Sequence, residues 1–352
     1  MPVLVLLVLA AVFPEVRSLS TPVLVLLSPR GVVGFVTFLG MYGCGALLVW
    51  EAAARWGKGW LSVLPLGAAY GIAEEGFATK SFVDPGEQLR ITQIPGGYGR
   101  ALGIEWATFV PIDIFHAAVS IGLSLLVVAL LFPEFKGRSL LGSRGLPVVA
   151  ACFAVDIGLQ FVNNDPGGIF AFLPALLFLA ALGLALVLLA WKLPTGGFVS
   201  MMRSSRPSAS PRTFFFVAAG WLFSLLFVYL LGSHLAVYWE SLGAFYVLGS
   251  ALVLYLLLTR AGWREHRLHQ IAFAAGMGAA FLLWDVVFGT LIGDVLAVPF
   301  AIFFLMLLVY LWSREERLAA ARVLLGHSDH PEKSGSIPAY GEPPGPDARV
   351  LK

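Results

Sequence analysis

The stretch WATFVPIDIFHAAVSIGLSLLVVALL, residues 106–131, decides the fold of this chain. Asp113 and His116 are its only ionisable side chains, and every other position is apolar or small and uncharged. About 20 consecutive apolar residues are enough for a helix to cross the hydrocarbon core of a bilayer. The stretch therefore predicts a transmembrane helix that carries a carboxylate and an imidazole into the membrane.

Similar apolar runs recur along the 352-residue chain, which is 59% hydrophobic and 12% charged and has a mean hydropathy of +0.85. Runs of this length separated by short polar joints predict an all-α, polytopic transmembrane helix bundle of about ten spans. The predicted spans are residues 2–13, 31–50, 60–79, 106–131, 146–162, 168–191, 213–232, 236–258, 270–292 and 295–313.

The predicted bundle occupies residues 31–313, between two regions of different character. Residues 1–30 form an N-terminal apolar segment and an outer loop. The short run at 2–13 fits a signal-like segment, a re-entrant piece or a true span. Residues 314–352 form a tail that is rich in Pro, Gly, Ser and charge from Ser328 onward and is predicted to be mostly disordered.

The basic residues in the joints predict how the chain is oriented. When the joints are assigned to alternating sides, counting back from the tail, 18 of the 23 Lys and Arg residues fall on the side that holds the tail. Because Lys and Arg are enriched in cytoplasmic loops, the C-terminus is predicted to be cytoplasmic. We expect a multi-pass protein of the cell membrane, with the lipid bilayer as its main partner.

With this orientation, the ionisable residues inside the predicted spans gather in the outer half of the membrane. Their depths follow from a helical rise of about 1.5 Å per residue. A charge at the bilayer centre costs about 2.5 to 3.5 kcal/mol, so each is expected to face protein, water or a partner. The group consists of Glu74, Glu75, Asp113, His116, Asp156, Glu240 and Asp285, with Asn163 close by in the sequence.

Two helix faces indicate which of these residues meet. Gly67, Gly71 and Glu75 recur every four residues, which gives a small-residue face where another helix can approach closely and a carboxylate at its end. Asp113 and His116 lie on one side of the next predicted helix. We therefore expect a direct or one-water contact between a glutamate of the pair and His116.

Such a cluster suits hydrolysis, because a buried carboxylate can act as the base that activates water while an imidazole stabilises the developing charge. Glu75 is the predicted base, on account of its place on the glycine face. Glu and His are also zinc ligands, but the chain has no H-E-x-x-H motif and no paired cysteines, so metal and cofactor content stay open. The predicted catalytic residues are Glu74, Glu75 and His116, supported by Asp113, Asp156, Asn163 and Asp285.

The Glu74-Glu75 pair at the end of one predicted span, followed by His116 in the next, resembles the CAAX-protease and bacteriocin-processing family of intramembrane glutamate proteases. The first motif of that family is Glu-Glu, three residues and Arg, whereas Lys80 stands one residue later here. Its second motif, Phe-x-x-x-His, has Ile112 at the Phe position, and its His-x-x-x-Asn/Asp motif has no match. The resemblance implies a membrane-embedded peptidase.

This resemblance covers about residues 60–125. The blocks YGIAEEG, residues 70–76, and KSFVDP, residues 80–85, also resemble a stretch shared by uncharacterised prokaryotic polytopic membrane proteins. That second resemblance implies a prokaryotic plasma membrane and no particular activity.

Two other function classes fit the same residues. Carboxylates and an imidazole at one depth are typical of proton- or cation-coupled transporters, and a polar layer can also simply hold the helices of a non-catalytic scaffold together. The connection at 81–105 is either a lid over the cluster or a surface turn. The expected partner beyond the bilayer is a membrane peptide or a small solute, and nothing in the sequence indicates nucleic-acid binding.

The orientation is testable with a reporter fused after Lys352. We expect a reporter that works only in the cytoplasm to be active there, because the tail side carries most of the basic residues. Activity of a reporter that requires export would contradict both the orientation and the shared depth of the ionisable residues.

Overall fold

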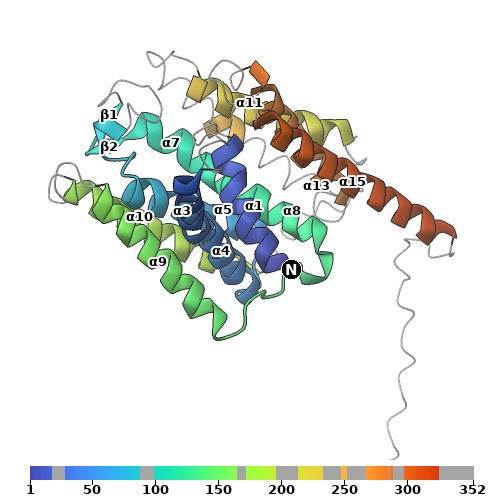
Figure 1. Ribbon diagram of the computed structural model, residues 1–352, viewed down its shortest axis with the longest axis horizontal. Coiled ribbons are helices and arrows are strands. Elements are labelled where there is room, and N and C mark those ends of the chain that lie inside the picture. Colours follow the sequence, from blue (N-terminus) through green and yellow to red (C-terminus); the bar gives the residue numbers. More distant parts are fainter. Residues whose placement is uncertain are drawn as a thin grey trace, which may run out of the picture. The chain divides into compact units, whose positions relative to one another are not determined.

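The computed structural model describes residues 1–17, 28–87, 99–164, 172–195, 213–232, 247–251, 267–284, 286–287 and 297–324 (Figure 1). The chain divides into two compact units, Met1–Trp312 and Ser313–Lys352. All packing and all sites below belong to the first unit.

The described residues are helical apart from a short hairpin and the connections, which confirms the helical class. Three long helices each contain a π-helical segment (η1 to η3), and η4 is a single 3-10 turn. In chain order the elements are α1 Pro2–Arg17, α3 Pro29–Phe38, η1 Leu39–Gly43, α4 Cys44–Arg55, α5 Trp60–Gly71, η2 Ile72–Ala78, β1 Arg100–Ala101, β2 Ile104–Glu105, α7 Trp106–Phe115, η3 His116–Leu123, α8 Ser124–Leu131, η4 Pro133–Phe135, α9 Gly145–Asn163, α10 Leu173–Lys192, α11 Thr213–Gly232, α13 Arg267–Trp284 and α15 Ala297–Leu324.

Five helices of the described residues are long and apolar enough to cross a membrane. They are Gly31–Arg55, Trp106–Leu131, Gly145–Asn163, Leu173–Lys192 and Val298–Leu318, and each overlaps a predicted span. The predicted spans at 2–13, 60–79, 213–232 and 270–292 also coincide with helices (α1, α5 with η2, α11 and α13). The predicted span at 236–258 lies mostly outside the described residues, so the number ten and the orientation stay predictions.

The last described helix extends past the last predicted span. Helix α15 continues to Leu324, whereas the predicted span ends at residue 313. The sequence Ser-Arg-Glu-Glu-Arg-Leu-Ala-Ala-Ala-Arg at 313–322 explains this, because its residues are mostly good helix formers. Residues 325–352 lie outside the described part of the chain.

Helix α5 is the element around which the polar cluster is organised. It contacts α10, α4, α7 and the π-helical segments η2 and η3. A Cβ atom on Gly67 would lie 2.8 Å from the Cα atom of Ala117, so the backbones of α5 and η3 nearly touch. The predicted small-residue face is therefore confirmed as a helix contact. The pair α11 and α13 packs in the same way through Gly220 and Gly276.

The connection after η2 is anchored at both of its described ends. Phe82, Val83 and Ile104 are fully buried, and β1 pairs with β2 in an antiparallel hairpin. Its turn residues Leu102 and Gly103 both have positive φ angles, 55° and 78°, as a two-residue turn of type I′ requires. Residues 88–98 lie outside the described part of the chain, so the choice between a lid and a surface turn stays a prediction.

Replacing Gly67 with Ala tests the contact between α5 and η3. The added Cβ atom would clash with the Ala117 backbone, so the helices must separate, and we expect a loss of about 1 to 3 kcal/mol in the free energy of unfolding. Gly158→Ala is the matched control, because no atom lies within 4 Å of a Cβ atom there. Thermal unfolding in detergent should show a lowered midpoint for the first variant alone, and equal midpoints would contradict the close packing.

Candidate functional site

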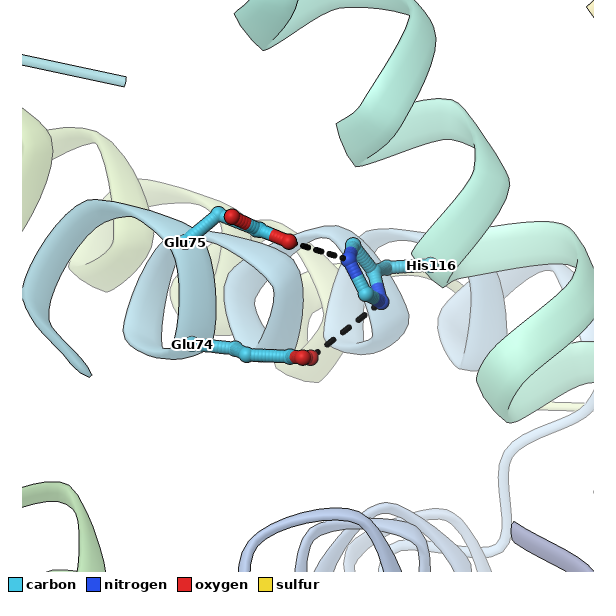
Figure 2. A group of neighbouring side chains, drawn as sticks. All are labelled: Glu74, Glu75 and His116. Carbon is cyan, nitrogen blue, oxygen red and sulfur yellow. Dashed lines mark hydrogen bonds and ion pairs between the residues drawn. The ribbon is translucent and has the colours of Figure 1, made fainter. Parts of the chain in front are cut away.

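The candidate site is formed by two π-helical segments that face each other. Glu74 and Glu75 lie on η2, and His116 is the first residue of η3. Short π-helical segments inside α-helices are uncommon and often occur at functional sites. The extra residue in each turn shifts the following side chains around the helix, and here both adjacent glutamates project toward one imidazole (Figure 2).

The imidazole of His116 lies between the two carboxylates. Its Nδ1 atom is 3.2 Å from Oε2 of Glu74, and its Nε2 atom is 3.3 Å from Oε1 of Glu75. The Nδ1 atom also lies 3.0 Å from Oγ of Ser120, one turn further along η3. All three charged side chains are buried, with exposed fractions of 1% for Glu74, 7% for Glu75 and 3% for His116. The predicted direct contact between the glutamate pair and His116 is present.

The Glu75 carboxylate is held by the turn that follows η2. The hydroxyl of Thr79 donates to Oε2 of Glu75 at 2.6 Å, and the hydroxyl of Ser81 donates to the same oxygen. Lys80, between them, has a φ angle of 63° and is only 1% exposed; its ammonium group donates to the carbonyl of Phe161 at 2.8 Å. The turn therefore folds back over Glu75, and its two hydroxyls hold the Oε2 atom of that carboxylate.

The Glu74 carboxylate has a different environment, which is mainly aromatic. The hydroxyls of Tyr42 and Tyr70 are close enough to interact with it, and both rings also contact the His116 ring, at centroid distances of 6.3 and 5.9 Å. Oε2 of Glu74 and the Tyr70 hydroxyl nevertheless have no hydrogen bond of ordinary geometry among the described residues. The Oε2 atom of Glu74 therefore has its ion pair with His116 but none of the hydroxyl donors that hold Oε2 of Glu75.

Tyr42 connects this site to the first helix. It lies on η1, the π-helical segment between α3 and α4, and its hydroxyl donates to Oε1 of Glu15 at 2.5 Å. Glu15 is near the end of α1 and is 8% exposed. Buried polar groups therefore continue from the Glu74 and His116 pair across to α1.

Asp113 lies beside the cluster without joining the ion pairs. A Cβ atom on Gly71 would be 2.5 Å from Oδ1 of Asp113 and 3.1 Å from Cβ of His116, so both side chains rest on the glycine. Asp113 is 8% exposed, and its Oδ1 atom has no hydrogen-bond partner among the described residues. The predicted supporting role for Asp113 therefore has a structural basis in its position.

The other predicted supporting residues lie elsewhere or cannot be placed. Asp156 on α9 packs against Gly40 and accepts a hydrogen bond from Gln160 at 3.4 Å, away from the glutamates. Asn163 is exposed at the end of α9, and its neighbour Asn164 donates to the carbonyl of Ala78 at 3.0 Å. Asp285 lies outside the described residues, as does Glu240. Among the described residues of the predicted layer, Glu74, Glu75, Asp113 and His116 lie together, where η2 and the end of α5 meet α7 and η3.

Sequence reasoning missed the residues that surround the charged cluster. Thr79 and Ser81 carry a weak local signal, because they follow Glu75 within six residues and their hydroxyls can reach back to it. Tyr70 precedes Glu74 by four residues, and this spacing places both on one stripe of the same helix. Tyr42 and Glu15 carry no such signal, since they reach the site only through packing between helices that are distant in the sequence.

Glu74, Glu75 and His116 form the one group among the described residues that could hold a metal ion, with ligand atoms within 4.8 Å of one another. The two imidazole nitrogens, however, face different carboxylates from opposite sides of the ring (Figure 2). The cluster is therefore paired internally, and one ligand atom from each side chain also lies close enough to the others to bind one ion.

Removing the imidazole tests the mutual dependence of these charges. We expect His116→Ala to reduce the free energy of unfolding by about 3 to 5 kcal/mol, because two buried carboxylates lose their partner. The unfolding midpoint should fall accordingly. Adding Glu74→Gln and Glu75→Gln to that variant should recover part of the loss, since the unpaired charges are then gone. Thermal unfolding of the wild type, His116→Ala and the triple variant is the measurement, and an unchanged midpoint in His116→Ala would contradict the ion pairs.

The family comparison covers nearly the whole chain. A model described as "Uncharacterized membrane protein family" matches residues 4–325, which include all the described helices apart from the first two residues of α1. No curated protein and no solved structure matches. These comparisons add no support to the resemblance to intramembrane glutamate proteases. They do agree with the resemblance to uncharacterised membrane proteins, and the chain belongs to this uncharacterised membrane protein family.

Proposed function

We propose that Glu74, Glu75 and His116 form the catalytic centre of a membrane-embedded hydrolase. The observation that carries the proposal is the unequal environment of two adjacent carboxylates around one imidazole. Hydroxyl donors hold Oε2 of Glu75, whereas Oε2 of Glu74 has its ion pair with His116 and no hydrogen bond of ordinary geometry. Adjacent carboxylates in different environments are typical of sites that need an acid and a base at once.

In this proposal Glu74 is the general base. It takes a proton from a water molecule, and the resulting hydroxide attacks the carbonyl carbon of an ester or amide bond. The sequence alone predicts Glu75 as the base. We assign the role to Glu74 because the hydroxyls of Thr79 and Ser81 already donate hydrogen bonds to Oε2 of Glu75. Glu75 instead orients the His116 ring through Nε2 and balances the charge of the imidazolium.

His116 has two tasks, which its position between the carboxylates allows. As an imidazolium it stabilises the negative charge that develops on the carbonyl oxygen. When the tetrahedral intermediate collapses, it donates its proton to the leaving oxygen or nitrogen and then regains one from Glu74, 3.2 Å away. The water proton thus ends on the leaving group, and the site returns to its starting state.

Proton-coupled transport is the second candidate, and one observation favours it. A row of buried groups that can each accept or donate a proton runs through the site. Its members, in spatial order, are Glu15, Tyr42, Glu74, His116 and Glu75. A transporter could use such a row to bind and release protons as its access alternates.

Substitution of the glutamates distinguishes the candidates in purified protein reconstituted into liposomes. With a fluorogenic acyl ester and a single-span reporter peptide as probes, we expect the wild type to hydrolyse at least one of them. Glu74→Gln should reduce the rate by about 10²- to 10⁴-fold, the usual contribution of a general base. Glu134→Gln, at an exposed position after α8, is the matched control and should keep the wild-type rate.

A transporter would give another result. Neither probe would be cleaved, and a pH gradient would drive solute uptake that Glu74→Gln abolishes. If all of Glu74→Gln, Glu75→Gln and His116→Ala leave hydrolysis and uptake at wild-type levels and only lower the unfolding midpoint, the cluster is structural.

A further inference from the structure

The ammonium group of Lys80 is buried, and the proposed reaction does not use it. Only 1% of the residue is exposed. Its Nζ atom donates to the carbonyl oxygen of Phe161 at 2.8 Å and lies 4.4 Å from the centre of the Phe161 ring. An ammonium group removed from water is unfavourable unless other groups bind it, so these contacts hold the side chain at the last turn of α9.

The backbone of Lys80 is also unusual. Its φ angle of 63° lies in the left-handed region, which few residues with a side chain adopt. The chain turns at this residue, and the hydroxyls of its two neighbours, Thr79 and Ser81, both donate to Oε2 of Glu75. Such backbone strain persists only where surrounding contacts maintain it. The bonds between the Lys80 side chain and α9 are contacts of this kind.

A second contact joins the same turn to α9. Asn164 directly follows α9, and its side-chain amide donates at 3.0 Å to the carbonyl oxygen of Ala78, the last residue of η2. Phe161 also lies against Phe77 of η2, with ring centroids 6.5 Å apart. Helix α9 has no fully buried residue. Specific interactions at its C-terminal end therefore define how it meets the turn.

The position of the turn affects how Glu75 meets the imidazole. The two hydroxyls hold Oε2 of Glu75, and the other oxygen, Oε1, lies 3.3 Å from Nε2 of His116. A carboxyl group is planar, so fixing one of its oxygens restricts where the other can lie. The contacts at α9 thus extend through the turn and Glu75 to the imidazole that the proposed reaction uses.

We propose that Lys80 is a positioning residue. Its ammonium group binds the end of α9, keeps the two hydroxyls of the turn on Glu75, and so holds Glu75 against His116. The effect of Lys80 on a reaction rate rests on the proposed hydrolase, whereas its effect on the turn does not. Because Lys80 acts through Glu75, it should contribute to the chemical step and not to substrate binding.

Kinetics of Lys80→Met in liposomes, with the acyl ester and peptide probes, test this role. The variant keeps most of the side-chain length but has no ammonium group. We expect kcat to fall about 10- to 100-fold, as for lost hydrogen bonds to a charged group, with KM changed less than about twofold. Lys80→Arg keeps a donor for the Phe161 carbonyl and should restore most of kcat.

Lys192→Met is the matched control for the kinetics. Lys192 also lies near an aromatic ring, 4.7 Å from that of Trp191, but it is exposed at the end of α10. This variant should keep the wild-type rate. Unchanged kcat in Lys80→Met would overturn the proposal, as would a loss confined to KM.

A double-mutant cycle separates positioning from a general loss of stability. In a background of Thr79→Val and Ser81→Ala the turn has no hydroxyls to place on Glu75, so adding Lys80→Met should change kcat less than about twofold. An equal loss in both backgrounds would mean that Lys80 acts by another route, and the proposal would then be wrong.

Hydrogen exchange measures the turn itself, without turnover. The amides of Val83 and Asp84 donate to the carbonyl oxygen of Lys80. In the full-length protein in detergent, Lys80→Met should raise the exchange rate of a peptide covering residues 79–84 about tenfold or more, because the turn opens more often. Exchange in α13, and in the same peptide of Lys80→Arg, should stay at the wild-type rate. An unchanged exchange rate in Lys80→Met would show that the ammonium group does not hold the turn.

Failure of this inference can be told apart from failure of the proposed function. Faster exchange in Lys80→Met together with an absence of hydrolysis in the wild type would keep the anchored turn and reject the hydrolase. Hydrolysis that depends on Glu74 but is insensitive to Lys80→Met would keep the hydrolase and reject the positioning role.

Discussion

The pairing of His116 with two buried glutamates is the constraint on which the rest of this structure depends. Isolated charges in an apolar interior are strongly unfavourable, so neither carboxylate could stay where it is without a donor. One imidazole satisfies both because its two nitrogens point in opposite directions, one to each glutamate. This requires adjacent residues of one helix to face the same point, which a regular α-helix does not allow.

The π-helical segments and the glycines supply that geometry. In η2 the wider turn lets Glu74 and Glu75 both face His116, and in η3 it starts at the histidine itself. Gly71 then lets the helices approach until Asp113 and His116 touch its backbone. The π-helical turns and Gly71 both bring the carboxylates to the imidazole, since a longer distance between the helices would leave the charges unpaired.

The site and a cavity beside it divide the polar residues between them. Glu74, Glu75 and His116 pair with one another, whereas Asp113 lines this apolar cavity between α5, α7, α11 and α13. Asp113 and His116 both rest on Gly71, so the cavity wall and the charged cluster meet at this glycine.

The sequence by itself determined the helical class, the positions of most long helices and the central members of the cluster. Apolar runs and the spacing of Gly67, Gly71 and Glu75 are local properties of the chain. They predict helices well because the bilayer requires backbone hydrogen bonds to be made within each helix. Only the tertiary structure decided which polar residues meet. Asp156 has the same predicted depth as His116, yet it packs against Gly40, whereas Tyr42 and Ser81 joined the site unpredicted. Depth follows from counting residues, but the direction of each side chain follows from π-helical turns and helix contacts, which depend on residues far apart in the chain.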